Sequence, residues 1–213
     1  MTNRVKQMIK AIIFDFDGVI FNTEEPVFKL IKKLCKKYKC PIKNKEEFLE
    51  LYNLNFFKSM EKRGVKGKKL DKFKKECEEE LKKLHLHIFQ SIPPLLKELS
   101  MHYYLAVISS NFKKIITYNL KKQSLLNYFS VLVGADIEES KVKRLKKCLE
   151  IFKIKPSEAV YIGDTAGDVK EAKKARIKTL AVTWGFHSRQ ALKKQKPNYI
   201  ASNPKQILKL LKK

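Results

Sequence analysis

Several features that mark secreted or membrane proteins are scarce or missing in this sequence of 213 residues. No apolar run is long enough to span a bilayer, because a membrane helix needs about 20 consecutive apolar residues. The N-terminal segment 1–10 lacks the apolar stretch of a signal peptide. The four cysteines, Cys35, Cys40, Cys77 and Cys148, form no CxxC pair, which favours reduced thiols. We therefore expect a cytoplasmic protein with no membrane partner.

Arginine is also scarce, although the chain is strongly basic. The 47 lysines and arginines exceed the 22 acidic residues and give a net charge of +25, yet only five of these cations are arginine. Arginine is the side chain that reads bases and clamps phosphates bidentately, and the lysines are spread over the whole chain. Compositional bias is therefore favoured over a dedicated nucleic-acid partner, which stays an alternative. A positive field would also attract a small phosphorylated substrate.

The hydrophobic pattern changes its period along the chain. Residues 11–16 form an apolar run that predicts a buried strand. Across residues 22–90 apolar side chains recur at helical spacing, and no convincing strand interrupts them. From residue 91 strands and helices alternate, which predicts a parallel sheet with helices on both faces. The sequence thus predicts an α/β, Rossmann-like, doubly wound core domain from residues 1–21 and 91–213, with a helical insertion after the first strand.

Polar residues follow three of the predicted strands, at the end of a parallel sheet where ligands bind. In chain order they are Asp15, Asp17 and Gly18 after the first strand, Ser109, Ser110 and Asn111 after "LAVI", Lys141 at a helix start, and Asp164, Thr165 and Asp168 after "AVYIG". The preference of polar residues for turns explains one such group, but it does not explain three groups that all follow strands of the same sheet. Four carboxylates cannot all ionise at close range without a cation, and oxygen ligands of this kind are those that Mg²⁺ prefers.

This set of groups is suited to phosphoryl transfer. A carboxylate beside a metal can attack phosphorus and form an aspartyl-phosphate that water then cleaves. A second aspartate can protonate the leaving oxygen and afterwards activate water. A serine hydroxyl, backbone N–H groups at a helix start and Lys141 could hold the phosphoryl oxygens. The pattern therefore predicts a Mg²⁺-dependent enzyme that works on phosphate by positioning and electrostatics.

Four segments resemble the ordered motifs of the haloacid dehalogenase superfamily: "DFDGVIFNT", "LAVISSN", the lysine of "EESKVKR" and "YIGDTAGDVKEA". In addition, "AVTWGF" and the closing "PNYIASNPKQILKLL" are similar to the phosphoglycolate phosphatase and β-phosphoglucomutase branch. The resemblance implies that residues 22–90 form a helical cap that closes over the site. It also implies a Mg²⁺-dependent phosphatase for a small phosphorylated metabolite, acting as a monomer or a homodimer.

The resemblance further implies a role for each matching residue. The implied catalytic residues are Asp15 as nucleophile, Asp17 as acid and base, Ser109 as phosphoryl ligand and Lys141 as the charge-stabilising cation. The implied substrate-binding residues are Gly18, Ser110 and Asn111, the last two through their N–H groups. The implied metal ligands are Asp15, Asp17 through its carbonyl, Asp164, and Asp168 directly or through water.

Two departures from the motifs leave the reaction partly open. Val142 follows Lys141, where the family usually has proline. After Asp17 the chain reads "GVI" at residues 18–20, whereas branches with phosphatase activity commonly read "GT" after this aspartate. The mutase branch shows a similar "GVI", so a phosphomutase of the β-phosphoglucomutase type is one alternative. A non-catalytic polyanion-binding protein is another, although none of the carboxylates is missing. Dehalogenation is disfavoured because Asp17 is present and a halide needs no proton.

A few other candidates have simpler interpretations. His85 and His87 would face different directions on the helix predicted there, so a structural role is favoured over a metal pair. Trp184 and His187 follow a predicted strand and are expected to pack rather than to contact substrate. In the insertion, the loop "KRGVKGK" is either a solvated turn or a source of cations for an anionic substrate. Those cations are Arg63, Lys66 and Lys68.

Overall fold

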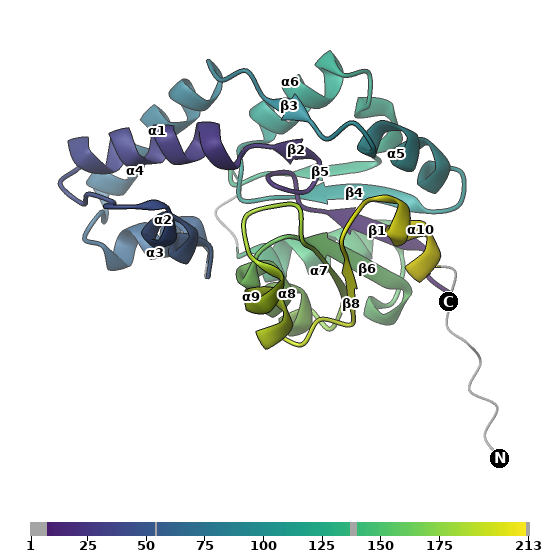
Figure 1. Cartoon of the computed structure of the whole chain (residues 1–213). Helices are drawn as coiled ribbons and strands as arrows, with labels where there is room; N and C mark the ends of the chain where they lie inside the picture. Colours follow the sequence, from purple (N-terminus) through teal and green to yellow (C-terminus); the bar gives the residue numbers. More distant parts are fainter. Residues whose placement is uncertain (1–7, 54, 137–139, 212–213) are drawn as a thin grey trace.

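The protein is built around a six-stranded parallel sheet (Figure 1). This computed structural model describes residues 8–53, 55–136 and 140–211. The strands stand in the order β5 (Val131–Val133), β4 (Tyr104–Ile108), β1 (Ala11–Phe14), β6 (Ala159–Gly163), β7 (Lys178–Val182) and β8 (Tyr199–Ala201). Every neighbouring pair is parallel. The order runs outward in both directions from β1, as in Rossmann-type sheets, so the predicted fold class is confirmed.

The central strand is shorter than the sequence suggests. The apolar run predicts a strand over 11–16, but β1 ends at Phe14. Its residue Ile13 pairs with Ala106 of β4 and with Tyr161 of β6, so β1 is buried between two neighbours. The N–H of Asp15 still donates to the Ile162 carbonyl, 2.8 Å away. The first acidic side chain therefore starts at the point where the strand ends, with its backbone held by the sheet.

Helices cover both faces of the sheet. One face carries α5 (Ile92–Ser100), α6 (Lys113–Lys122) and α10 (Lys205–Leu211), and the other carries α7 (Lys141–Phe152), α8 (Ala166–Lys174) and α9 (Arg189–Lys194). Two short 3-10 helices, η2 (Leu126–Tyr128) and η3 (Pro156–Glu158), precede strands. Alternate residues of β1 face opposite layers: Phe14 packs with the first set, and Ile13 packs with α7 and α8.

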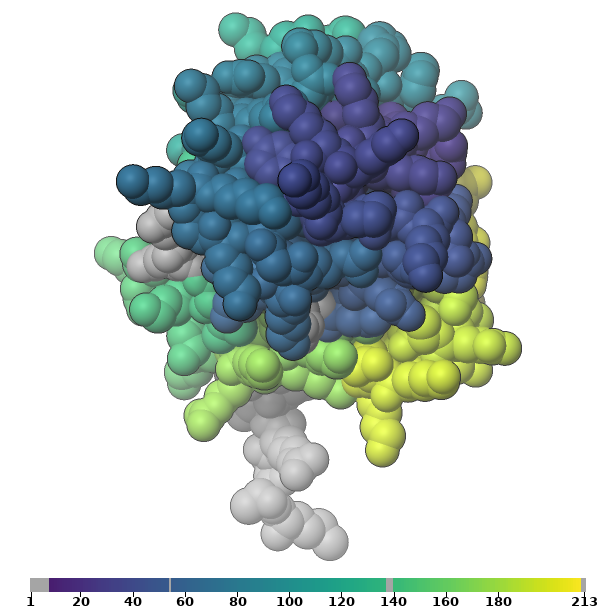
Figure 2. All heavy atoms as spheres, turned by 90° about the vertical axis from the view of Figure 1, so that its left-hand side faces the viewer, coloured from purple at the N-terminus to yellow at the C-terminus, as the bar shows by residue number. Residues whose placement is uncertain are grey.

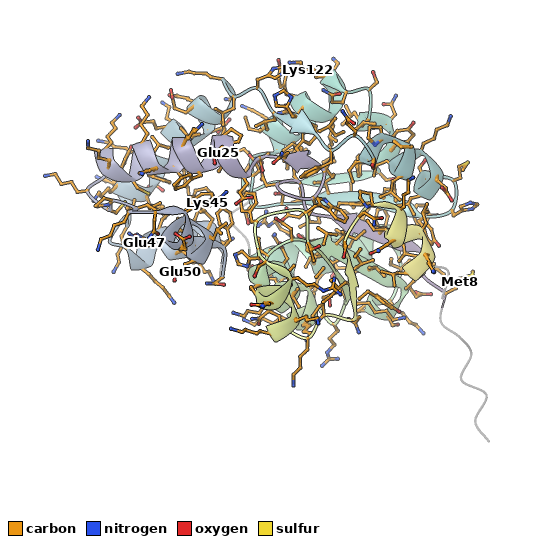
Figure 3. The ribbon with its side chains drawn as sticks, in the orientation of Figure 1. Met8, Glu25, Lys45, Glu47, Glu50 and Lys122 are labelled. Atoms are coloured by element: carbon orange, nitrogen blue, oxygen red, sulfur yellow. The ribbon has the colours of Figure 1, made fainter. Side chains whose placement is uncertain are left out.

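The chain between β1 and α5 forms a lobe of helices that stands beside the sheet, on the left in Figure 1. It consists of α1 (Glu24–Lys37), α2 (Lys45–Glu50), η1 (Leu51–Asn53), α3 (Phe56–Lys62) and α4 (Lys68–Leu81). In Figure 2 the atoms of this lobe, purple to blue, occupy the middle of the face shown, above green and yellow atoms of the later part of the chain. The apolar stripe of α1 is buried, and charged side chains of the lobe pair with one another. Lys45, labelled in Figure 3, has its Nζ 2.8 Å from Glu24 Oε1. The division into a core domain and a cap at residues 22 and 90 stays a prediction.

The expectation that residues 22–90 contain no strand is wrong. Strand β2 (Phe21–Asn22) pairs antiparallel with β3 (His87–Ile88), and α4 has already ended at Leu81. His85 and His87 are therefore not helical, and their rings lie side by side, with centroids 5.0 Å apart. The pairing joins segments 60 to 70 positions apart, which a local hydrophobic pattern cannot reveal. His85 contacts Lys122 of α6, 3.4 Å from Nδ1 to Nζ (Figure 3).

The membrane prediction can be checked on the helices that the structure describes. None of them is long and apolar enough to cross a bilayer. Residues 1–7 of the N-terminal segment, and 212–213 of the predicted closing helix, lie outside the described residues.

Candidate active site

The predicted site residues come together at the carboxyl end of the sheet. Asp15 follows β1, Ser109 follows β4 and Asp164 follows β6, at the point where the strand order reverses. Lys141 reaches the same place from the first turn of α7, which Ser140 caps by accepting a hydrogen bond from the Lys143 N–H. These side chains line one small cavity under the helical lobe.

Three carboxylates form the centre of this cavity. Asp15, Asp164 and Asp168 each place one oxygen within 4.8 Å of the other two, and all three side chains are buried. Asp164 Oδ2 accepts a hydrogen bond from the Phe186 N–H at 2.7 Å. Asp164 Oδ1 is buried and has no hydrogen-bond partner. A buried carboxylate oxygen without a partner is costly, so this cluster is incomplete as it stands.

Lys141 supplies the one ammonium group among the described residues that line this cavity. Its Nζ lies 3.1 Å from Asp15 Oδ2, 2.6 Å from Asp168 Oδ1 and 3.1 Å from the Tyr161 hydroxyl. Burial acts to lower the pKa of Lys141, but the charges of Asp15 and Asp168 raise it well above its usual value. The ammonium therefore stays protonated and bridges two of the three carboxylates.

The carboxylates differ in how strongly they hold their protons. Burial raises the pKa of Asp15 to about 7, against the lowering effect of Lys141. Burial, and then the charges of Asp168 and Asp15, raise the pKa of Asp164 well above its usual range. Burial also acts on Asp168, but the charge and hydrogen bond of Lys141 bring its pKa below the usual value. One ammonium thus neutralises only part of the cluster.

The donor set fits a divalent cation. Three carboxylates converge, one of their oxygens has no partner, and burial together with the charges of Asp168 and Asp15 raises the pKa of Asp164. Oxygen ligands from two or three carboxylates, with room left for water and phosphate, are typical of Mg²⁺ sites. Asp15, Asp164 and Asp168 are the residues that could hold the metal. These three are among the four metal ligands that the sequence predicts, and the role of the fourth, the Asp17 carbonyl, stays a prediction.

Asp17 has a different environment from the cluster. Its two carboxylate oxygens accept hydrogen bonds from Asn111 Nδ2, at 3.2 and 3.0 Å. Burial raises the pKa of Asp17, which favours the protonated acid. The sequence-based interpretation gave Asn111 a backbone role toward substrate, but its N–H donates to Ser109 Oγ, 3.1 Å away. The side chain of Asn111, which positions Asp17, was missed.

The start of α8 fixes Asp168. Thr165 N and Thr165 Oγ1 both donate to Asp168 Oδ2, at 3.1 and 2.6 Å, and the Asp168 N–H donates back to Thr165 Oγ1. This reciprocal cap leaves Asp168 Oδ1 for Lys141. His187 packs behind the same turn, since its Nδ1 accepts from the Ala166 N–H and its Nε2 lies 3.0 Å from the Leu49 carbonyl. A structural role for His187 is thus confirmed.

Gly18 allows the loop after β1 to approach Asp164. Its φ is +68°, and a Cβ placed there would lie 2.0 Å from Asp164 Oδ2. The indole Nε1 of Trp184 donates to the Val19 carbonyl of the same loop, at 3.3 Å, so Trp184 packs as expected. The predicted substrate contact of Gly18 stays a prediction, and its observed contact is with a carboxylate of the cluster.

The cations proposed for the insertion loop do not line the site. Arg63 Nη2 donates to the Pro41 carbonyl at 2.6 Å and lies 3.4 Å from Glu47 Oε2. Lys66 and Lys68 are exposed, and neither they nor Arg63 are among the described residues that line the site cavities. The loop therefore fits the solvated turn of the two interpretations.

Two buried residues near the site were missed from the sequence. Arg144 is 2% exposed, and its Nη1 donates to the carbonyls of Ser109 and Gly134 at 2.6 and 2.7 Å. It stands one turn after Lys141 and so shares its face of α7, a spacing that could have identified it. Tyr161 lies in the apolar run of β6, where nothing in the sequence distinguishes its hydroxyl from a core side chain.

Comparisons with known proteins agree with this arrangement. Residues 12–182 match the family model described as haloacid dehalogenase-like hydrolase, and the chain belongs to that family. Over 95% of its length it is 28% identical to a phosphoglycolate phosphatase of Aquifex aeolicus, covering 97% of that protein, and 24% identical to the pyrophosphatase PpaX of Bacillus mycoides, also covering 97%. A haloacid dehalogenase-like hydrolase structure from Streptococcus pneumoniae superposes with a TM-score of 0.76 at 24% identity, covering 95% of this chain and 98% of that one. The predicted family resemblance is confirmed.

Proposed function

We propose that this protein is a cytoplasmic, Mg²⁺-dependent phosphatase that hydrolyses a small phosphorylated metabolite through an aspartyl-phosphate on Asp15. The observation that carries the proposal is the buried cluster of Asp15, Asp164 and Asp168, in which one oxygen lacks a partner and Lys141 bridges two carboxylates. The names of the relatives support the phosphatase class, since they include two kinds of phosphatase.

Asp15 is the residue best placed to attack phosphorus. The Phe16 N–H donates to Asp15 Oδ1 at 2.8 Å, and Lys141 holds Oδ2, so the carboxylate is fixed in one orientation. A phosphoryl group in the cavity would meet Asp15 on one side, with the hydroxyls of Ser109 and Ser110 and the Lys141 ammonium around it. These donors would stabilise the charge that develops on the phosphoryl oxygens.

Asp17 is suited to move the proton. Its raised pKa favours the acid, which protonates the leaving oxygen as the bond from Asp15 to phosphorus forms. The resulting Asp17 carboxylate then takes a proton from the water that attacks the phosphoryl group on Asp15. The Asn111 amide holds both Asp17 oxygens and so keeps the carboxyl aimed at the cavity through both steps.

Mg²⁺, when bound, would offset the negative charge of the carboxylates and of the phosphate. Asp164 and Asp168 would hold it together with Asp15. The Thr165 cap and the Phe186 N–H orient these two carboxylates, so their positions do not depend on the metal alone.

The proposal is tested by phosphate release from a panel of phosphorylated metabolites, with and without Mg²⁺. Asp15→Asn should lose the activity by about a thousandfold or more, because it removes the nucleophile. Asp136→Asn is the matched control, since Asp136 is exposed and its carboxylate accepts a hydrogen bond from the Lys113 N–H away from the cluster. Full activity in Asp15→Asn, or phosphate release that does not depend on Mg²⁺, would overturn the proposal.

The two alternatives give different results in the same experiment. A phosphomutase would move phosphate between positions of a sugar phosphate and release little of it. A polyanion-binding protein would release none and would bind nucleic acid with strong salt dependence. Either result would replace the phosphatase proposal.

A further inference from the structure

A second small cavity opens from the first on the side of the helical lobe. The two cavities share Asp17, Tyr52, Phe56 and Ser110 among their lining residues. The second cavity therefore begins at the carboxyl that protonates the leaving oxygen in the proposed mechanism. Whatever is attached to that oxygen would extend into this space. We call it the leaving-group cavity, and the inference below rests on the proposed function.

The walls of the leaving-group cavity are mainly apolar. Val27 and Ile31 enter from α1, Leu81 and Cys77 from α4, and Phe57 from α3. Cys77 adds no charge, because burial raises the pKa of its thiol to about 12. None of the described residues that line the cavity is a lysine, an arginine or a histidine. Asp17 is the one carboxyl among the described lining residues, and the proposed reaction uses its proton.

Three cations of the lobe, Arg63, Lys74 and Lys37, make contacts outside the lining of this cavity or at its margin. Arg63 contacts Pro41 and Glu47, as described above. Lys74 lies 5.5 Å from the centroid of the Phe57 ring and lines a different cavity, toward α7. Lys37 pairs with Glu76 at the outer surface, with Nζ and Oε1 2.5 Å apart. None of these three cations is among the described residues that line the leaving-group cavity, so none is placed as a direct counter-ion for an anionic leaving group.

The leaving-group cavity is also small. Its volume is about 40 Å³, only a few times the roughly 10–15 Å³ that one water needs, so the space favours a short leaving group. We propose that the enzyme selects phosphate monoesters whose leaving group is short, uncharged and largely apolar. This class excludes glycolate, which carries a carboxylate, and phosphate, the leaving group of pyrophosphate. The substrate of this enzyme would thus be neither phosphoglycolate nor pyrophosphate, the compounds in the names of its relatives.

The physical reason for the selection is desolvation. A charged group moved from water into an apolar cavity without a partner loses more hydration than it regains. An apolar chain of the same length gains free energy from the same transfer. Phosphoglycolate, propyl phosphate and aminoethyl phosphate have leaving groups of nearly equal length that are anionic, neutral and cationic. They separate the charge of the leaving group from its size.

The test is kcat/KM for these three compounds with the full chain and Mg²⁺. We expect propyl phosphate to exceed each charged compound by about tenfold or more. Hydrolysis of phosphoglycolate or aminoethyl phosphate at an equal or higher rate would overturn the inference while leaving the phosphatase intact. Release from none of the compounds, and none from p-nitrophenyl phosphate, would instead show that the proposed function itself fails.

A pair of variants tests whether this cavity sets the size limit. Ile31→Ala enlarges the cavity, and should raise the preference for pentyl over propyl phosphate by about fivefold or more. Leu34→Ala removes a buried side chain from the same helix, but Leu34 does not line the cavity. It should therefore leave the preference unchanged, even if it lowers stability. An equal change in both variants, or a change in neither, would overturn the assignment of this cavity.

Discussion

Asp164→Asn should stabilise the protein when no metal is bound. In the wild type, oxygens of Asp164, Asp15 and Asp168 lie within 4.8 Å of one another. Where Asp164 and a neighbouring carboxylate are both ionised, two unit charges at that separation repel by about 3.5 kcal/mol at an effective dielectric constant of about 20. Lys141 cancels part of this repulsion, so we expect a net gain of about 2 kcal/mol in the free energy of unfolding. For a chain of this size that corresponds to a midpoint about 4–8 °C higher.

The gain should depend on pH in a defined direction. The pKa of Asp164 is raised in the folded state, so the fold favours the protonated carboxyl. The wild type is therefore most stable relative to the variant below pH 4, near the unfolded pKa, and loses this contribution as pH rises toward the folded pKa. The advantage of Asp164→Asn should be small below pH 4 and larger at pH 8, measured by thermal unfolding in EDTA.

Mg²⁺ should reverse the comparison. A ligand that binds only the folded state stabilises it, by about 2.7 kcal/mol at a hundred times its dissociation constant. The wild type should gain stability with Mg²⁺, whereas Asp164→Asn should gain little, and Asp136→Asn should behave as the wild type. A variant that is less stable than wild type in EDTA at pH 8, or equal stabilisation of both by Mg²⁺, would refute this reasoning.

Three further substitutions test other parts of the site. Lys141→Met should remove most of the phosphatase activity, and it should cost about 3–5 kcal/mol of stability because it leaves buried carboxylates unpaired. Lys143→Met, at an exposed position of the same helix, should change neither. Steady-state kinetics and denaturant unfolding would measure the two effects. Gly18→Ala should weaken Mg²⁺ binding, measured by calorimetry, because the new Cβ would displace the Asp164 carboxylate. Gly64 also has a positive φ, +87°, but a Cβ there would meet nothing within 4 Å, so Gly64→Ala should only lower stability. Arg144→Met should cost about 2–4 kcal/mol in urea unfolding, because two buried carbonyls lose a charged donor; unchanged stability would contradict its role.

The position of the candidate active site was predictable because its geometry follows from the sheet. Asp15, Ser109 and Asp164 each come directly after an apolar run, and parallel strands end at one edge, so adjacency in space follows from position along each strand. Lys141 and Asp168 lie in the first turns of helices that start at the same edge. For these residues local sequence and topology point to the same place.

Other features could not be found in this way, because they depend on contacts between distant segments. Strand β3 forms only by pairing with β2, more than 60 positions earlier, so the histidines of that segment were assigned to a helix. The hydroxyl of Tyr161 reaches Lys141 only through the register of β6. The side chain of Asn111 donates to Asp17, 94 positions earlier, a contact that depends on its rotamer. The walls of the leaving-group cavity combine three helices whose apolar residues look like ordinary core.

The measurement that tests the mechanism most directly is the capture of the phosphoryl group on the enzyme. Wild-type protein turning over a labelled phosphomonoester with Mg²⁺ would be quenched in acid, digested and mapped. We expect the label on the peptide that contains Asp15, stable in acid and lost on treatment with hydroxylamine. Asp15→Asn should carry no label, and Asp136→Asn should carry as much as wild type. Label on another residue, or steady hydrolysis with no labelled enzyme and an active Asp15→Asn, would contradict catalysis through Asp15.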